Sequence, residues 1–299
     1  MSLINNAIVS VVKRMPESVV WQFSKRYIAG TTLNDAVDFV KKLNEKGIYA
    51  TIDVLGESVQ SKDEAVTAKQ NALKVLEAIE TNKLMANLSI KPTQMGLGID
   101  EEFTYKNVYD LVETAAKKNN FIRIDMEDSP FTDKTIALYK KLHEKFSGVG
   151  IVVQACLKRT EKDVVSLNPE GCNYRIVKGI YVEPVEISFR DRQEIRDNYV
   201  KVLEIMLKDG NYVGIATHDE HLINEAYRLI KKYNVPNDKF EFQMLLGVRE
   251  DLRDKINADG YKIRIYVPFG KDWFAYCTRR LKENPDFTKN VVKSVFGIN

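Results

Sequence analysis

The sequence is poor in cysteine, in long apolar runs and in excess charge of either sign, and each shortage excludes a class of protein. Its three cysteines form no C-x-x-C pair and no even set, so we expect reduced thiols in a cytoplasmic protein. No apolar run reaches the ~18 residues that a membrane-spanning helix needs. The net charge is only +3 over 299 residues, whereas nucleic-acid binders concentrate lysine and arginine on one element.

Two short motifs lack the residues that would make them functional. Gly96-Leu-Gly98 is followed by glutamate at position 101, where a dinucleotide-binding fingerprint has its third glycine. His218 and His221 open a predicted helix, but no third or fourth metal ligand accompanies them. Helix capping around Asp219 explains this segment better, so the sequence predicts no metal site.

Short β-rich runs alternate with longer helical patterns along the whole chain, without a low-complexity segment or linker. This alternation predicts a parallel sheet with helices outside. Eight strands favour closure into a (β/α)8 barrel over a doubly wound open sheet. The expected strands span 48–54, 87–91, 121–125, 151–155, 174–177, 212–216, 240–244 and 262–267. The expected helices span 63–84, 107–118, 133–146, 161–167, 190–208, 220–233, 249–257 and 272–282.

We therefore expect one α/β domain over 1–299. An N-terminal helical arm covers 1–46, the strands and their helices cover 48–267, and C-terminal helices cover 270–299. The first thirty residues are basic and amphipathic, as in an organelle transit peptide. Because they run without a break into the helical pattern that follows, a structural arm is the better interpretation.

On nearly every predicted strand, the alternate side chains that point to one face are polar. Barrel interiors are usually filled with branched apolar side chains instead. Buried charges need partners, so these residues either pair among themselves or contact a ligand, and we favour a large polar cofactor. The polar set is Asp53, Lys91, Arg123, Asp125, Gln154, Arg175, Thr217, Glu241, Gln243, Arg264 and Tyr266. The apolar neighbours expected beneath the helices are Ile52, Ile90, Ile124, Val153, Ile176, Ala216, Phe242 and Ile265.

The final predicted helix carries Tyr276, Arg279, Arg280 and Glu283 at i, i+3, i+4 and i+7, so they share one face. Two guanidinium groups side by side suit a planar anion such as a carboxylate. Taken alone, the pattern also fits an exposed charged stripe with Arg–Glu pairs.

Several strand-end segments occur together in one order that resembles the proline dehydrogenase family, in its short monofunctional bacterial form. These flavoenzymes oxidise L-proline to Δ1-pyrroline-5-carboxylate, the first step of proline catabolism. The segments that carry the resemblance are Leu55-Gly-Glu57, Ser89-Ile-Lys91-Pro-Thr, Ile122-Arg-Ile-Asp125-Met126-Glu127-Asp128, Val153-Gln154-Ala-Cys, Tyr174-Arg175-Ile-Val177-Lys178-Gly179, Ala216-Thr217-His218-Asp219, Phe240-Glu-Phe-Gln243-Met and the block 266–284.

The resemblance implies a distorted barrel of the TIM type, with FAD across the carboxyl ends of the strands and a final helix over the mouth. Arg175 would approach flavin N5, where it acts as a catalytic residue. The other residues implied in cofactor binding are Met126, Val153 and Gln154 at the ring, Lys178 and Gly179 at the ribityl–diphosphate portion, Thr217 and His218 at the diphosphate and adenosine side, and Val177.

For the substrate, the resemblance implies that Lys91, Arg279 and Arg280 bind the proline carboxylate. Asp125, Tyr266 and Tyr276 would shape the pocket around the ring, with Glu283 on the same helix face. Glu57, as a lid paired with Arg279, and Leu245, as an apolar wall, match the family pattern less closely. Asp125 is a candidate catalytic residue, and we favour a positioning role for it over that of a general base.

The implied reaction moves a hydride from proline C5 to flavin N5, and the implied electron acceptor is a quinone. A quinone would bring the protein into peripheral contact with a membrane, and residues 3–29 are one candidate contact surface. Two other functions remain open at this point. One is a Schiff-base enzyme that uses Lys91 or Lys178 as nucleophile, and the other is a non-catalytic ligand-binding barrel.

Overall fold

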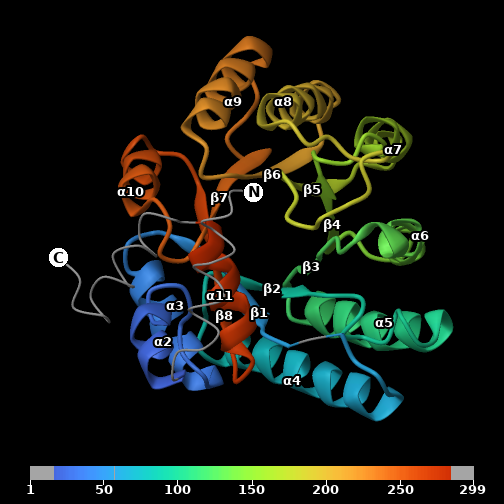
Figure 1. The fold of residues 1–299 in the computed structure, drawn as a ribbon, viewed down its shortest axis with the longest axis vertical. Helices are drawn as coiled ribbons and strands as arrows, with labels where there is room; N and C mark the ends of the chain where they lie inside the picture. The colour runs from blue at the N-terminus through green and yellow to red at the C-terminus, as the bar shows by residue number, and fades with distance from the viewer. Residues whose placement is uncertain (1–16, 57, 284–299) are drawn as a thin grey trace.

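The computed structural model describes residues 17–56 and 58–283, with side chains for 20–22, 24–56 and 58–278. Within these ranges, parallel strands β1 to β8 close in sequence order into a barrel, and β8 pairs with β1. Helices surround the barrel (Figure 1). The predicted (β/α)8 architecture is confirmed. The strands are β1 Tyr49–Val54, β2 Ala86–Ile90, β3 Ile122–Ile124, β4 Val149–Gln154, β5 Asn173–Val177, β6 Tyr212–Ala216, β7 Phe240–Leu245 and β8 Ile263–Phe269.

The helices follow the predicted positions, with one error at α5. This helix begins at Glu101, because the Asp100 side chain accepts a hydrogen bond from the amide of Phe103 and caps it. The sequence pattern had placed its start at residue 107. The helices are α2 Glu17–Ser24, α3 Leu33–Asn44, α4 Lys62–Thr81, α5 Glu101–Lys117, α6 Thr132–His143, α7 Thr160–Leu167, α8 Arg192–Lys208, α9 Glu220–Tyr233, α10 Glu250–Ala258 and α11 Trp273–Glu283, with short 3₁₀ turns at Ser129–Phe131 and Asn168–Glu170.

The lumen is polar, as the strand parity predicts, except at β6. There Ala216 pairs with Gln243 and Gly214 with Glu241, so the lumen face of β6 carries Gly214 and Ala216. Thr217 was expected on the lumen face and Ala216 beneath the helices, and this assignment is wrong by one residue. Because Gly214 has no side chain, the alternation of polar and apolar side chains does not show which residues of β6 face the lumen.

Glycines make room for long polar side chains inside the barrel. A Cβ atom at Gly214 would lie 2.4 Å from Gln243 Nε2, and one at Gly150 would lie 2.5 Å from a terminal nitrogen of Arg123. Both distances are far below van der Waals contact. The missing side chains on β4 and β6 therefore allow Arg123 and Gln243 to extend across the lumen.

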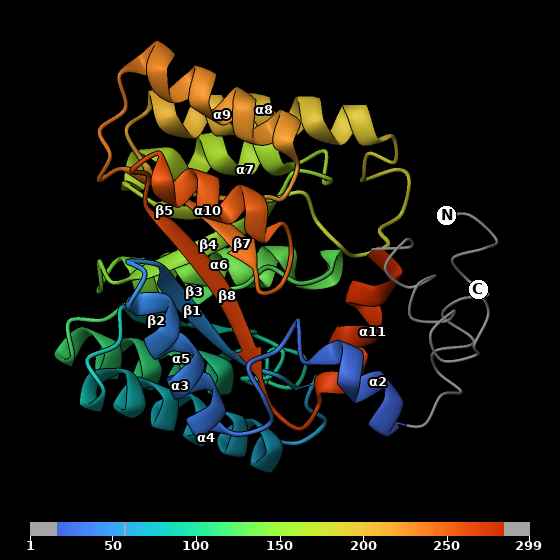
Figure 2. The same ribbon diagram turned by 90° about the vertical axis from the view of Figure 1, so that its left-hand side faces the viewer.

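The N-terminal arm and the last helix pack together at the carboxyl ends of the strands (Figure 2). They meet in a small apolar cluster, in which the rings of Trp21 and Trp273 pack edge to face with their centroids 4.8 Å apart. Backbone hydrogen bonds join the two ends, from Ala29 N to Pro268 O and from Gly270 N to Gly30 O. The final helix thus lies over the barrel mouth, as predicted, and α2 supports it.

Candidate active site

An ionic network occupies the carboxyl end of the lumen. Lys91 Nζ lies 3.0 Å from Asp53 Oδ1 and 3.5 Å from Asp125 Oδ2. Asp125 Oδ1 accepts hydrogen bonds from Ser89 Oγ at 2.7 Å and from Arg175 at 2.8 Å. These residues come from the ends of β1, β2, β3 and β5, so the barrel brings together four segments that lie far apart in the sequence.

Arg175 and Tyr266 complete this network. The Arg175 guanidinium donates through Nε to Gln243 Oε1 at 2.6 Å, and its centre lies 5.4 Å from the Tyr266 ring. The Tyr266 hydroxyl donates to Asp125 Oδ2 at 3.0 Å and accepts from Lys91 Nζ at 3.3 Å. The predicted catalytic pair, Asp125 and Arg175, is therefore in direct contact. The predicted substrate ligands Lys91 and Tyr266 adjoin it.

The charges in this network shift one another's pKa values. Burial favours the neutral form of Asp125, but Lys91 and Arg175 outweigh it, and the pKa of Asp125 is lowered. Burial would likewise lower the pKa of Lys91, yet Asp53, Tyr266 and Asp125 together outweigh this effect and raise it well above its ordinary value. A carboxylate with a lowered pKa is a weak base, which favours a positioning role for Asp125.

The same shift bears on the Schiff-base alternative. A nucleophilic lysine needs a depressed pKa so that its neutral amine is available. The raised pKa of Lys91 keeps it an ammonium ion, which suits binding of a carboxylate and opposes nucleophilic attack.

A second polar layer lies below the first. Arg264 and Glu241 form a two-point ion pair, with distances of 2.6 and 3.1 Å, and Gln243 Nε2 donates to the same carboxylate. Arg123 donates to the carbonyl of Asn173 at 2.7 Å and to its side-chain oxygen at 2.5 Å. We expected a cofactor to account for most of the polar lumen. The structure shows instead that side chains and backbone carbonyls of the lumen itself satisfy this layer.

The residues expected at the flavin ring surround the ends of β3, β4 and β5. Gln154 donates to the carbonyl of Glu127 at 2.9 Å and pairs in register with Val177. Met126 and Val153 lie in the main hydrophobic core. The Val153 side chain packs away from the lumen, so its expected cofactor contact falls to its backbone.

Glu127 is a residue that the sequence reasoning left without a role. Its buried carboxylate accepts from Thr93 N at 2.8 Å and Thr93 Oγ1 at 2.6 Å, and burial raises its pKa. Glu127 thereby connects Thr93, in the loop after Lys91, to Gln154 at the end of β4, which donates to the Glu127 carbonyl. Its place beside Asp125 in the strand-end segment was the available signal.

Positive charge gathers around one buried carboxylate beyond β5. Asp219 accepts a two-point pair from Arg196 at 2.8 and 2.9 Å, and Lys178 Nζ lies 3.3 Å away. Arg192 approaches within 3.6 Å. Although burial opposes ionisation, these cations lower the pKa of Asp219 far below its usual range. Three cations against one carboxylate leave two positive charges in excess, which makes this a candidate anion site.

Gly179 follows Lys178 with φ of +99°, and a Cβ atom there would lie 2.2 Å from Cys156 Sγ. This position therefore requires glycine for both its backbone angle and its close approach. Nearby, Thr217 Oγ1 accepts from Asp219 N at 3.1 Å, and His218 Nε2 accepts from Leu245 N at 2.8 Å. The residues predicted to hold the phosphate and adenosine portions thus lie on adjoining strand ends.

The last predicted ligands belong to α11. Tyr276 is half-buried and packs against the cluster formed with α2. Arg279, Arg280 and Glu283 belong to the same helix, but their side chains lie outside the described residues, as does Glu57. Their expected roles stay predictions. Leu245 pairs in register with Tyr266, which places it beside the network, and its role as an apolar wall stays a prediction.

The described residues contain no group of three histidine, cysteine, aspartate or glutamate side chains placed to hold a metal ion. Within the described ranges, none of the helices combines the length and the apolar character that crossing a membrane requires.

Comparisons with known proteins agree with this geometry. The proline dehydrogenase family model matches residues 36–293. Proline dehydrogenase 2 of Bacillus subtilis (strain 168) is 36% identical over 260 residues, which cover 87% of this chain and 86% of the relative. The chain belongs to the proline dehydrogenase family. It is thus an oxidoreductase of proline catabolism, and the resemblance to the short monofunctional form is confirmed. The proline dehydrogenase of Deinococcus radiodurans is 34% identical, with 95% and 93% coverage.

A solved structure shows the same fold in a much longer protein. Proline utilization A (PutA) from Bdellovibrio bacteriovorus, crystallised after inactivation by N-propargylglycine, superposes with a TM-score of 0.82 at 23% identity. The match covers 88% of this chain and 33% of that one, so this chain spans about a third of its length. At this identity the likeness shows the barrel fold alone.

Proposed function

We propose that this protein oxidises L-proline to Δ1-pyrroline-5-carboxylate with bound FAD, by hydride transfer from proline C5. The observation that carries the proposal is the network of Lys91, Asp125, Arg175 and Tyr266 at the carboxyl end of the barrel. Active sites of such barrels lie at this end. The network offers a fixed cation for a carboxylate beside an arginine for the developing charge.

Lys91 holds one end of the substrate. Its ammonium lies between Asp53 and Asp125 and is kept charged by them, so it attracts the carboxylate of proline without reacting. Arg279 and Arg280 on α11 supply two more cations from above. Tyr276 and Leu245 close the pocket around the ring. Holding the ring by its charged end orients C5 towards the cofactor.

The described residues fit FAD. The two excess positive charges around Asp219 match the two negative charges of a diphosphate, and Gly179 lets the chain approach closely at the same place. When bound, FAD supplies the hydride acceptor. Lys178, Gly179, Thr217 and His218 would hold its diphosphate and adenosine portions. Met126, Val153, Gln154 and Val177 would adjoin its ring.

Arg175 stabilises the negative charge that arrives with the hydride, because its buried guanidinium is already aimed by Gln243 and Asp125. Asp125 holds Arg175, Lys91 and Tyr266 in one arrangement, while the amine of proline loses its proton to solvent or to another acceptor. The transfer thus depends on a preformed arrangement of charges.

The test is optical. Purified protein should be yellow, with flavin bands near ~450 nm, and should bleach under anaerobic conditions when L-proline is added. D-Proline at the same concentration serves as the control. A colourless protein that stays without spectral change after reconstitution with FAD would remove the proposal.

The acceptor that reoxidises the cofactor is proposed to be a quinone, reached through a peripheral membrane contact of this cytoplasmic protein. Residues 3–29 remain the candidate surface for this contact, and 3–16 among them lie outside the described residues. Turnover with a lipophilic quinone that rises on addition of liposomes would support it. Equal turnover with and without liposomes would oppose it.

A further inference from the structure

The loop that joins β5 to α8 turns large apolar side chains towards solvent. Their exposed fractions range from 40% to 73%, and the residues are Ile180, Val182, Val185 and Ile187. Because these side chains make little contact with the barrel, they do not fix the place of the loop. The loop begins with Lys178 and Gly179, which are expected at the diphosphate of FAD and therefore need a fixed place.

Backbone hydrogen bonds fasten both ends of this loop to the segment after β4. Cys156 N donates to Lys178 O at 2.8 Å, and Lys158 N donates to Ile187 O at 2.9 Å. The stretch 179–186 lies between these two bonds. Its position against the barrel therefore depends on the side chains within it.

Glu183 is the buried residue in the middle of this stretch. It is 3% exposed, although Val182 before it and Pro184 after it are exposed. Its carboxylate accepts a hydrogen bond from Ser129 N at 2.9 Å. Within the described ranges no lysine or arginine forms an ion pair with this carboxylate. Buried polar groups depend strongly on the partners they have, so the bond to Ser129 holds this side chain in place.

The bond joins two parts of the candidate site that are distant in sequence. Ser129 begins the 3₁₀ turn in the loop after β3, and it lies 54 residues before Glu183. The loop after β3 also carries Met126, which is expected at the flavin ring. The loop after β5 carries Lys178 and Gly179. One side-chain hydrogen bond thus connects the segment expected at the ring to the segment expected at the diphosphate.

Glu183 also lies near the point where this loop approaches the barrel most closely. A Cβ atom at Gly179 would lie 2.2 Å from Cys156 Sγ. Burial raises the pKa of Cys156 to about 11, and the nearby charge of Glu183 adds to the effect. Gly179 and Glu183 are therefore both close to the same thiol. The carboxylate holds the loop where Gly179 makes its close approach.

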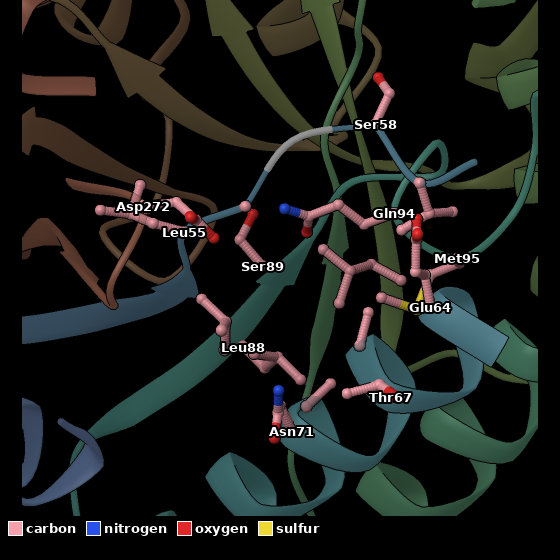
Figure 3. Close-up of a pocket in the computed structure, with 16 residues that line it drawn as sticks. Leu55, Ser58, Glu64, Thr67, Asn71, Leu88, Ser89, Gln94, Met95 and Asp272 are labelled. Carbon is pink, nitrogen blue, oxygen red and sulfur yellow. The ribbon is translucent and has the colours of Figure 1, made fainter. Parts of the chain in front are cut away.

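The loop after β3 is itself held by side-chain hydrogen bonds to the loops before it. Thr93, in the loop after β2, binds the carboxylate of Glu127, and Ser58 Oγ, in the loop after β1, donates to Thr93 Oγ1 at 3.3 Å. Figure 3 shows Ser58 together with Gln94, the residue after Thr93, at the cleft between α4 and the ends of β1 and β2. Hydrogen bonds thus link the loops from β1 to β3, and Glu183 extends this set to β5.

We propose that Glu183 is a positioning residue for the cofactor, which binds Ser129 N and so holds Lys178 and Gly179 where they meet the diphosphate of FAD. The proposal rests on the proposed function, since it requires FAD at the ends of the strands. Glu183 acts through its loop and does not touch the cofactor. A loop that is already in place loses less conformational freedom when the ligand binds, so the ligand is held more tightly.

The test compares substitutions at two glutamates of the same loop in the full-length, FAD-loaded enzyme. Glu183→Met removes the acceptor and keeps a side chain of similar length. Glu183→Gln keeps a carbonyl oxygen that accepts from Ser129 N, so it serves as the rescue variant. Glu186→Met is the matched control, because Glu186 is exposed. The rate of FAD release after dilution is followed by the change in flavin fluorescence. Hydrogen exchange is followed at residue 129 and at residues 180–187.

We expect Glu183→Met to release FAD about tenfold faster than wild type, as for the loss of one hydrogen bond. The amides at 129 and 180–187 should exchange faster in the same variant. Glu183→Gln and Glu186→Met should stay within about twofold of wild type in both measurements. A bond that only stabilises the fold would lower the free energy of unfolding of Glu183→Met and leave its FAD release unchanged.

Release of FAD at the wild-type rate from Glu183→Met, once circular dichroism shows that it folds, would overturn the proposal. So would release from Glu183→Gln that is as fast as from Glu183→Met, because the acceptor atom would then not matter. If Glu183→Met does not fold, Ser129→Pro removes the donor instead, at the first position of a turn where proline is tolerated. It should release FAD about tenfold faster, and a wild-type rate would overturn the proposal equally.

The two possible failures are distinguishable. A wild-type protein that binds no FAD would remove the proposed function, and with it the cofactor role of Glu183. A wild-type protein that binds FAD and is bleached by proline, with variants that release FAD at the wild-type rate, would remove only the role of Glu183.

Discussion

The two polar layers of the lumen contain similar residues but hold them differently. In the lower layer, Glu241 and Arg264 are 2% and 12% exposed and meet at two points. In the upper layer, Lys91 is 25% and Asp125 is 14% exposed, and their closest approach is 3.5 Å. The lower charges have fixed, buried partners. The upper ones are partly accessible and share several partners.

The difference shows that buried charge alone does not identify an active site. Both layers read alike in the sequence, as polar side chains of one parity on parallel strands. In the upper layer Lys91 lies near two carboxylates, Asp53 and Asp125, so a substrate carboxylate could replace one of them without leaving the ammonium unpaired. We therefore expect loss of a lower-layer charge to affect mainly the stability of the barrel, and loss of an upper-layer charge to affect mainly the proposed reaction.

The largest effect on stability is expected from Glu241→Gln, which leaves Arg264 buried without its counter-charge. Loss of one partner of a buried ion pair costs about 3–5 kcal/mol, measured as the free energy of unfolding in urea at pH 7. The rate of flavin reduction in the folded variant should stay near that of wild type. A variant as stable as wild type but slow in catalysis would reverse the roles of the two layers.

Glu241 also gives that variant a pH signature. Attraction by Arg264 outweighs burial and lowers the pKa of Glu241 from 4.5 to about 2. A lowered pKa stabilises the fold above pH 4.5, and this contribution is lost as the pH falls towards 2. Wild type should lose stability across this interval. Glu241→Gln should lose less, because it lacks the titrating group.

In the upper layer, Arg175→Met should slow flavin reduction by about 10²–10³-fold, as for loss of a preorganised donor to a developing charge. Anaerobic stopped-flow with proline measures this rate. Arg264→Met is the matched control, with the same substitution in the lower layer. It should lower stability and leave the reduction rate of folded enzyme almost unchanged. Equal rates in both variants would contradict the division.

Gly214→Ala links the two layers, because its Cβ would displace Gln243 and so release both Arg175 and Glu241. Overpacking of this kind costs about 1–3 kcal/mol. Urea unfolding should show that loss, and stopped-flow should show slower flavin reduction. An unchanged reduction rate would mean that Gln243 does not hold Arg175 in its working position.

The smallest effect is expected from pH on the upper layer itself. The pKa of Asp125 is lowered below 3.8 and that of Lys91 is raised well above 10.5. Neither group should therefore titrate between pH 5 and pH 9. Any limb in the profile of kcat/KM over that range should belong to the substrate amine or another group, and Asp125→Asn should leave its midpoint in place. A midpoint that moves in this variant would assign the limb to Asp125.

The sequence predicted the barrel because its strands and helices alternate and because most strands show their parity. It failed on the lumen face of β6, where Gly214 carries no side chain to read. It favoured a cofactor over mutual pairing for the polar set and so did not predict the pairing of the lower layer, because contacts such as that of Arg264 with Glu241 depend on how far the strands are staggered around the barrel. That stagger arises only when β8 closes on β1.

The sequence named most residues of the candidate site through the family resemblance. It gave no role to Ser89 or Glu127, because each acts through another residue. Their value appears only in distances, such as the 2.7 Å between Ser89 and Asp125. The sequence analysis expected Asp219 to cap a helix, but in the structure the Asp219 side chain makes no capping hydrogen bond to α9 and pairs with Arg196 and Lys178 instead.

The packing of α2 against α11 affects the order in which parts of the chain can fold during synthesis. The helix that carries Arg279 and Arg280 docks on side chains from the opposite end of the described chain, among them Val20 and Tyr27. During synthesis the barrel strands are made before α11. The apolar side chains of α2 that pack against α11 therefore stay uncovered until α11 is made. If Arg279 and Arg280 bind the substrate as proposed, its capture is the last property that the nascent protein acquires.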